Sequence, residues 1–160
     1  MYDVVIIGGG PAGYVSAIRC SQLGLSVACV ESMQDEDGIQ KYGGTCLNVG
    51  CIPSKALLES SQRFYDVNNK LDKHGIKAIN VELDIPAMMN RKDKIVSQLV
   101  GGVSGLFKAN KVTPIQGHGK LLSGMKVEVT NGESIKILEA KNIILASGSA
   151  PIEISAATFD

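Results

Sequence analysis

The sequence predicts an α/β fold: a parallel sheet with helices, plus a small antiparallel β-meander. Short apolar runs at 4–7 and 26–30 are typical of buried parallel strands. A helical pattern lies between them, over 14–23. The dipeptide Asn131-Gly132 predicts a hairpin turn between two later β runs. Together these features indicate a βαβ unit at the start of the chain and antiparallel pairing towards its end.

Composition narrows the function classes. The 160 residues are 44% hydrophobic, enough for one core, and 16 basic residues balance 16 acidic ones. We therefore expect no nucleic-acid partner, and no apolar run approaches the ~20 residues of a membrane span. Four cysteines and no leader-like start favour a cytoplasmic protein. We expect one domain over 1–150 and a linker over 151–160.

A glycine motif, G-x-G-x-x-G, joins the first strand to the first helix. Gly8 allows a tight turn, Gly10 lets a pyrophosphate approach the backbone, and Gly13 allows the helix to pack closely on the strand. The helix N-terminus favours phosphate binding. Glu31, at the end of the second strand, is placed to accept hydrogen bonds from ribose hydroxyls. The motif predicts dinucleotide binding and leaves NAD and FAD both open.

The remaining elements follow from periodicity and breakers. We expect a helix from about Cys46 to Tyr65, no regular structure over 67–83, and a long helix to Ala109 that is capped by Asp84. Gly101-Gly102 in that helix indicates a kink or a close packing contact. β runs are expected at 112–121, 126–130, 134–138 and 142–146, the last of them buried.

Cys46 and Cys51 are five positions apart, in the stretch G-G-T-C-L-N-V-G-C-I-P-S-K. Three roles are possible for the two cysteines: a metal site, an inert structural role and a redox-active disulfide. A metal site would need further paired ligands, which the sequence lacks. Five helical residues rise ~7.5 Å, beyond the ~7 Å Cα separation of a disulfide. A bridge would therefore require a break in the helix, which Gly50 permits. The residues favour the redox pair, with Cys20 and Cys29 as small buried apolar side chains.

These two motifs resemble the flavoprotein pyridine nucleotide-disulfide reductases, over residues 2 to about 154. Leu47 and the Ile52-Pro53-Ser54 spelling resemble the dihydrolipoamide dehydrogenase branch. The resemblance implies a Rossmann-like FAD-binding domain. It also implies that Cys51 faces the flavin, that Cys46 exchanges with dihydrolipoamide, and that NAD+ accepts the electrons. The cofactor-binding residues that it implies are Gly8, Gly10, Pro11, Ala12, Gly13, Glu31, Gly44, Thr45, Lys55, Gly119, Ser147, Gly148 and Ser149.

The resemblance also implies partners: a second copy in a homodimer, and dihydrolipoamide on lipoyl domains of 2-oxo acid dehydrogenase complexes or the glycine cleavage system. Two features depart from it, a long loop over 32–42 and Ser147 in place of the usual Thr. The family's second dinucleotide motif and its catalytic His–Glu pair have no match here. We therefore expect a first segment that is inactive alone, retains FAD weakly and self-associates. The alternatives are a mercuric or glutathione reductase and a non-catalytic FAD-binding fragment.

Overall fold

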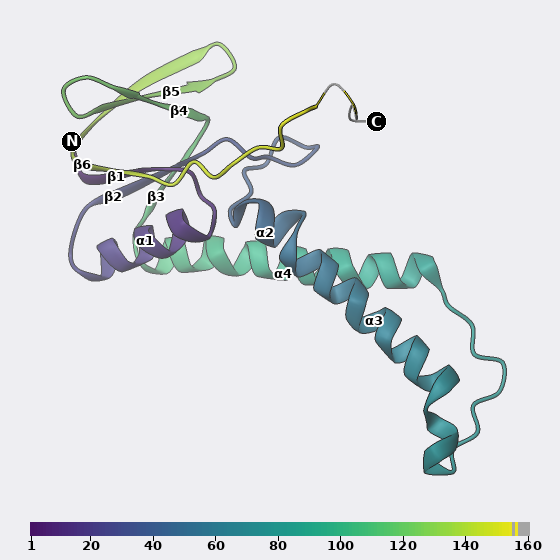
Figure 1. Ribbon diagram of the computed structural model, residues 1–160. Coiled ribbons are helices and arrows are strands. Elements are labelled where there is room, and N and C mark those ends of the chain that lie inside the picture. Colours follow the sequence, from purple (N-terminus) through teal and green to yellow (C-terminus); the bar gives the residue numbers. More distant parts are fainter. Residues whose placement is uncertain (155, 157–160) are drawn as a thin grey trace.

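The computed structural model describes residues 1–154 and 156. Six strands form one sheet in the order β3-β2-β1-β6-β5-β4, and helices cover part of it (Figure 1). Along the chain the elements are β1 (Tyr2–Ile7), α1 (Pro11–Gln22), β2 (Val27–Glu31), α2 (Gly44–Asn48), α3 (Cys51–Asn69), the 3-10 helix η1 (Leu71–His74), α4 (Ile85–Ala109), β3 (Thr113–Gln116), β4 (His118–Leu122), β5 (Lys126–Asn131) and β6 (Ser134–Leu145).

The predicted fold class is confirmed. β1 lies between β2 and β6 and is parallel to both, and β3 joins β2 in parallel. β4, β5 and the first half of β6 form the antiparallel meander. The turn at Asn131-Gly132 closes the β5–β6 hairpin, in which Asn131 pairs with Ser134, as the sequence predicts. The carboxyl ends of β1, β2 and β6 therefore lie at one edge of the sheet.

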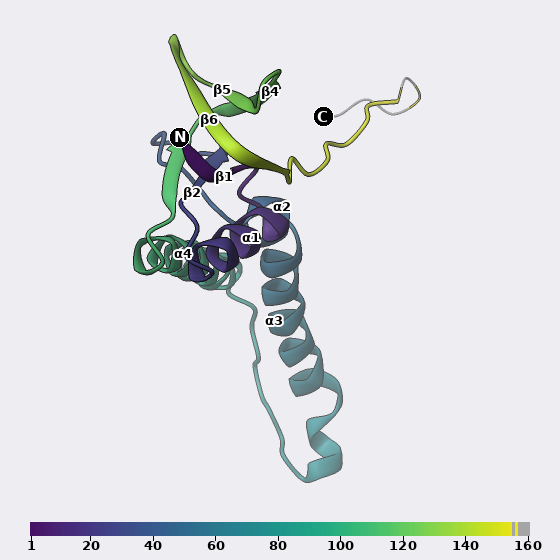
Figure 2. The same cartoon turned by 90° about the vertical axis from the view of Figure 1, so that its left-hand side faces the viewer.

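Alternate residues of β1 face two separate cores. Val4 and Ile6 belong to a buried cluster with Phe107 of α4. Val5 and Ile7 belong to a second cluster, with Val127 and other residues of the meander. Figures 1 and 2 show the corresponding layers, with α1 and α4 on one side of the parallel strands and β4–β5 on the other. Because both faces of β1 are covered along residues 4–7, this part of the strand is continuously apolar, as in other buried parallel strands.

The helix starts follow their capping residues. α1 begins three residues before the predicted position, because Pro11 fits the first helical turn and Gly10 precedes it as the N-cap. The prediction for α4 is confirmed, since the Asp84 side chain accepts a hydrogen bond from the Ala87 N–H at 2.9 Å. α4 runs unbroken through Gly101-Gly102. A Cβ on either glycine would meet nothing within 4 Å, so of the two alternatives for this pair, a kink or a close packing contact, the close contact is wrong.

The helix expected over 46–65 is instead two helices. The backbone leaves helical geometry at Gly50, with φ −117° and ψ −107°, so α2 ends at Asn48 and α3 starts at Cys51. This break satisfies the geometric condition for a bridge between the two cysteines. α3 then continues to Asn69, and η1 follows it, so the expected lack of regular structure is wrong over 67–74 and confirmed over 75–83. Polar residues in the last turns of α3 hid its helical period.

The structure divides two of the predicted β segments differently from the sequence analysis. The run 112–121 divides at Gly117, whose φ of +138° turns the chain from β3, parallel to β2, into β4, antiparallel to β5. By contrast, 134–138 and 142–145 belong to the single strand β6, which ends one residue before the predicted boundary at 146. That strand pairs with β5 up to Glu139 and with β1 from Ala140 onwards. Its last part is not buried as expected, because Leu145 is 62% exposed.

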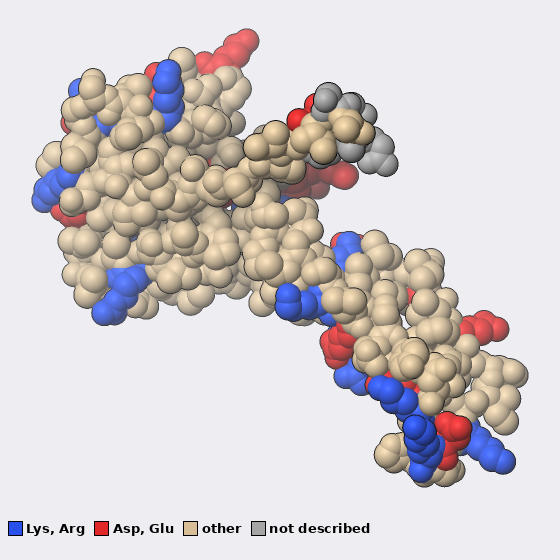
Figure 3. Space-filling model, viewed as in Figure 1, with Lys and Arg blue, Asp and Glu red and all other residues tan. Residues whose placement is uncertain are grey.

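α3 and α4 form an antiparallel pair whose far end extends away from the sheet (Figures 1 and 3). Glu59 of α3 pairs with Arg63 at 2.9 Å and with Arg91 of α4 at 2.8 Å.

Within the described residues, no helix is long and apolar enough to cross a membrane. Residues 151–154 and 156 of the expected linker are exposed. The rest of the linker, 155 and 157–160, lies outside the described residues.

The Asp3 side chain joins the starts of β1 and β2 to β6. Its Oδ1 lies 2.7 Å from Lys141 Nζ, and its Oδ2 accepts hydrogen bonds from N and Oγ of Ser26 at 2.9 and 2.6 Å. The bond from Lys141, followed by those from Ser26, holds the pKa of the Asp3 carboxyl well below its ordinary value. The carboxylate therefore stabilises the fold above the unfolded-state pKa of about 3.9, and this contribution is lost as the pH falls below it.

We expect Asp3→Asn to melt below the wild type at neutral pH, with a difference that shrinks as the solution is acidified below about pH 4. Circular dichroism melts across that range measure the effect. The control is Asp72→Asn, which removes an exposed carboxylate in η1 and should show no such trend. A wild-type advantage that stays constant into acid would contradict the role of Asp3.

Candidate functional site

A pocket of about 720 Å³ lies at the carboxyl ends of β1, β2 and β6. This is the edge at which parallel α/β sheets bind ligands. Segments far apart in the sequence line it: the glycine motif, the end of β2, the start of α2, the β3–β4 turn and the segment after β6. The lining residues are Ile7, Gly8, Gly10, Pro11, Ala12, Val30, Glu31, Ser32, Met33, Gln34, Gly44, Thr45, Cys46, Gly117, His118, Gly119, Ala146, Ser147, Gly148 and Ser149.

The glycines of the motif differ in what surrounds them. Gly8 has φ +104°, in the left-handed region that favours glycine. A Cβ on Gly13 would lie 1.8 Å from the Gly8 carbonyl oxygen, so α1 packs on the turn too closely for any side chain there. A Cβ on Gly10 would meet only the Gly44 Cα, at an ordinary 3.7 Å. The fold therefore does not require a glycine at position 10, but the absence of a side chain there leaves free space on the pocket side.

Glu31 is a buried acid with a structural task that the sequence did not reveal. Its Oε2 accepts a hydrogen bond from the Gly9 N–H at 2.7 Å, and its Oε1 accepts one from the Met33 N–H at 2.8 Å. The carboxylate therefore ties the glycine turn to the segment after β2. Ser32 Oγ also lies 3.5 Å from Oε1. Glu31 lines the pocket, so its carboxylate can accept hydrogen bonds from a ligand there.

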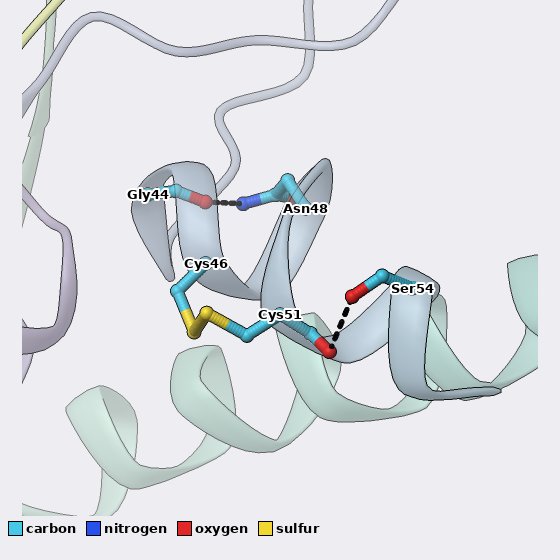
Figure 4. Close-up of a disulfide and its surroundings, with 5 residues drawn as sticks. All are labelled: Gly44, Cys46, Asn48, Cys51 and Ser54. Atoms are coloured by element: carbon cyan, nitrogen blue, oxygen red, sulfur yellow. Dashed lines mark hydrogen bonds between the residues drawn. A yellow bond between two sulfur atoms is a disulfide. The ribbon is translucent and has the colours of Figure 1, made fainter. Parts of the chain in front are cut away.

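Cys46 and Cys51 form a disulfide with a Cα–Cα distance of 4.6 Å (Figure 4). Cys46 lies in α2, is half-buried and lines the pocket. Cys51 is the first residue of α3 and is exposed, as is Lys55 one turn later. Neither of these two residues lines the pocket, although the sequence predicted both to lie near the bound cofactor. Within the described residues, no cluster of three or more His, Cys, Asp or Glu side chains is arranged for a metal ion.

α2 is seated directly on the glycine motif. The Gly43 N–H donates to the Gly9 carbonyl at 2.9 Å. Gly44 has φ +58°, and a Cβ there would lie 2.8 Å from the Gly10 Cα. A side chain at Gly44 would push the two backbones apart. The contact therefore fixes the turn that carries Cys46 beside the predicted phosphate-binding loop.

The structure brings most of the predicted site residues to one pocket, with Gly13 directly behind its wall. Sequence reasoning missed Ser32, Met33 and Gln34, which follow β2, and Ala146, which follows β6. Their positions in the sequence could have identified them, because residues that follow the ends of neighbouring parallel strands meet at one edge of the sheet. His118, the first residue of β4, also lines the pocket.

Comparison with known proteins places the chain in a family. The family model described as pyridine nucleotide-disulphide oxidoreductase matches residues 2–158. The chain belongs to this family. The mitochondrial dihydrolipoyl dehydrogenase of Pisum sativum is 48% identical over 99% of the chain, and that of Dictyostelium discoideum is 53% identical over 92%.

The matched part is a minor share of these relatives. The chain spans 30% of the length of the Pisum protein and 29% of the Dictyostelium one. Among solved structures, the Cu(II) complex of the HOCl-induced flavoprotein disulfide reductase RclA from Escherichia coli matches with a TM-score of 0.77. It is 24% identical, and the match covers 96% of this chain and 30% of that one. This structure supports the fold alone.

Cys29, a free cysteine in the buried strand β2, gives a test of how burial affects thiol reactivity. Its side chain is buried in β2, and this burial, followed by the charge of Glu31, raises the pKa of the thiol to about 12. Because the thiolate is the reactive form, we expect iodoacetamide near neutral pH to alkylate Cys29 at least about a hundredfold more slowly in the folded chain than in urea. Time-resolved peptide mass spectrometry measures both rates. Equal rates would show that Cys29 is accessible.

Proposed function

We propose that this chain is the FAD-binding first segment of a dihydrolipoyl dehydrogenase, with Cys46–Cys51 as its redox-active disulfide. The observation that carries the proposal is the seating of the disulfide turn on the glycine motif, so that one pocket borders both. The names of the relatives, at 48% and 53% identity, support the choice of enzyme. The expected domain spans 1–150, with a linker after it.

The residues around the pocket suit FAD. The N-terminus of α1 offers free N–H groups to a pyrophosphate, and Gly10 leaves space for it. Glu31 is placed for ribose hydroxyls, and Gly119 and the turn at 147–149 supply backbone groups around the same space. The chemistry that bound FAD would supply is two-electron transfer from the cysteine pair towards NAD+.

The bonds and electrons of the disulfide step balance between the substrate and the two cysteines. A dihydrolipoamide thiolate attacks Cys46 Sγ, the Cys46–Cys51 bond breaks, and Cys51 leaves as a thiolate. The second dihydrolipoamide sulfur, also as a thiolate, then displaces Cys46, so that lipoamide forms; the two protons released by the substrate thiols convert the cysteine pair to a dithiol. Cys51 suits the leaving role, because the N-terminal end of the 19-residue helix α3 favours a negative charge. Lys55 adds a positive charge one turn away.

The wider assignments belong to the same proposal. In the whole protein NAD+ is the final acceptor, the enzyme is a homodimer, and its substrate is carried on lipoyl domains of 2-oxo acid dehydrogenase complexes or the glycine cleavage system. We propose a cytoplasmic location from the composition, although the Pisum and Dictyostelium relatives are named as mitochondrial. The segment alone is proposed to lack NAD-linked turnover and to bind FAD weakly.

The cofactor assignment is tested by a matched pair of Gly→Ala variants. A methyl group at Gly10 fits the fold but occupies the space next to the motif, so we expect FAD affinity to fall by about tenfold or more. Gly102→Ala, in an open position on α4, should leave affinity unchanged. Titration of each chain with FAD, followed by flavin fluorescence, measures the affinities. Equal affinities for both variants and the wild type would contradict the proposed binding mode.

The redox assignment is tested by thiol release. We expect excess dihydrolipoamide to reduce the native disulfide and to expose two thiols, at Cys46 and Cys51. Mass spectrometry of alkylated peptides identifies them, and the Cys46→Ser/Cys51→Ser variant is the control. A disulfide that resists dihydrolipoamide natively, yet is reduced in urea, would indicate the inert structural role. Reduction by glutathione but not by dihydrolipoamide would favour another member of the family.

A further inference from the structure

Asn48, the last residue of α2, makes two hydrogen bonds with its side-chain amide. Its Nδ2 donates to the Gly44 carbonyl at 3.0 Å and to the Tyr42 carbonyl at 3.2 Å. Two carbonyl acceptors fix the orientation of the amide, because only its NH2 group can donate. Oδ1 is buried and has no partner within the described residues. The amide is therefore held by the bonds that it donates, and Figure 4 shows the one to Gly44.

α2 is a short helix, and the Asn48 side chain adds to its backbone bonding. The helix has five residues, far fewer than a stable isolated helix needs. The Leu47 N–H reaches the Gly43 carbonyl at a long 3.4 Å, and the Val49 N–H reaches the Thr45 carbonyl at 3.0 Å. The bond from Asn48 to Gly44 spans the same turn and encloses Cys46. The side-chain amide thus adds a further hydrogen bond to the backbone bonding of the turn that carries Cys46.

Cys51 is held differently. It opens α3, in which 19 residues form a continuous helix. The Ser54 N–H donates to the Gly50 carbonyl at 3.0 Å, and Ser54 Oγ donates to the Cys51 carbonyl at 3.1 Å. Because these bonds do not involve the disulfide, we expect the helix to stay intact when the disulfide opens. The separation of the two thiols in the reduced state is therefore governed by the turn that contains Cys46.

We propose that Asn48 is a positioning residue for the Cys46–Cys51 pair. Its amide keeps the Cys46 turn wound after the disulfide is reduced, so that the two thiols stay within reach of each other. The proposal rests on the redox function proposed above. Loss of the amide frees the Cys46 turn and lowers the effective concentration of one thiol at the other. The disulfide of such a variant is then easier to reduce.

The exchange with glutathione measures this effect: one protein disulfide and two glutathione thiols give one protein dithiol and one glutathione disulfide. We expect Asn48→Asp and Asn48→Leu to shift this equilibrium about tenfold or more towards the dithiol, which is about 30 mV. Asn68→Asp and Asn68→Leu are matched controls, because Asn68 Nδ2 makes the same kind of bond, to the Phe64 carbonyl at 2.8 Å, on exposed α3. Asn48 variants within twofold of the wild type would overturn the proposal.

A second measurement holds even if the variants fail to fold. In the wild type, the side-chain amide protons of Asn48 should exchange slowly with solvent in both the oxidised and the reduced chain. Loss of that protection on reduction, while the sheet amides stay protected, would overturn the proposal. The redox function fails separately: a wild-type disulfide that never equilibrates with glutathione rejects it. An equilibrating wild type with unshifted Asn48 variants rejects the role of Asn48 alone.

Discussion

The close approach of Gly44 to Gly10 is the contact on which the candidate site depends. It brings two backbones together where no side chain fits on Gly44, and the bond from the Gly43 N–H to the Gly9 carbonyl secures it. Tyr42 continues the contact into the core, because a Cβ on Gly9 would lie 2.6 Å from its ring. That ring packs on Phe107 of α4, with centroids 4.6 Å apart. The disulfide turn is thus fixed to the glycine motif and to the helical layer together.

The sheet supplies the other half of the arrangement. β1 is buried on both faces, between the helices and the meander, so its carboxyl end is a rigid support for the glycine turn. β6 belongs to both parts of the sheet, antiparallel to β5 and then parallel to β1. It therefore brings the residues after Leu145 to the pocket, while the meander that it anchors brings Gly119. Glu31 closes this arrangement by bonding the turn after β1 to the segment after β2.

Local signals predicted much of this architecture. The glycine motif, the Asp84 cap and the Asn131-Gly132 turn each specify a backbone conformation within a few residues, so the βαβ unit, the start of α4 and the hairpin could be predicted. The division at Gly117 and the continuity of β6 depend on which strands pair, which is decided by residues distant in the sequence. The end of α3 was missed because its last turns are polar and lie on the extended helical pair.

The site was predictable to the same extent. Gly8, Gly10, Gly13 and Cys46 belong to compact motifs whose spacing carries their chemistry, and their functional roles stay predictions. Contacts between the motifs had no sequence signal: neither the bonds of Glu31 to Gly9 and Met33 nor the seating of Gly44 on Gly10 follows from spacing. The double hydrogen bond of Asn48 was likewise hidden, because an asparagine near a helix end is common and its partners depend on the fold.

The most direct test of the central claim, that one pocket joins the glycine motif to the disulfide turn, is a titration of the isotopically labelled chain with FAD monitored by backbone amide NMR. Our account predicts that the amides of Gly10, Gly44 and Cys46 shift together, along one saturation curve, with those of Ser147–Ser149. Shifts confined to the glycine motif, with Gly44 and Cys46 unaffected at saturation, would contradict it.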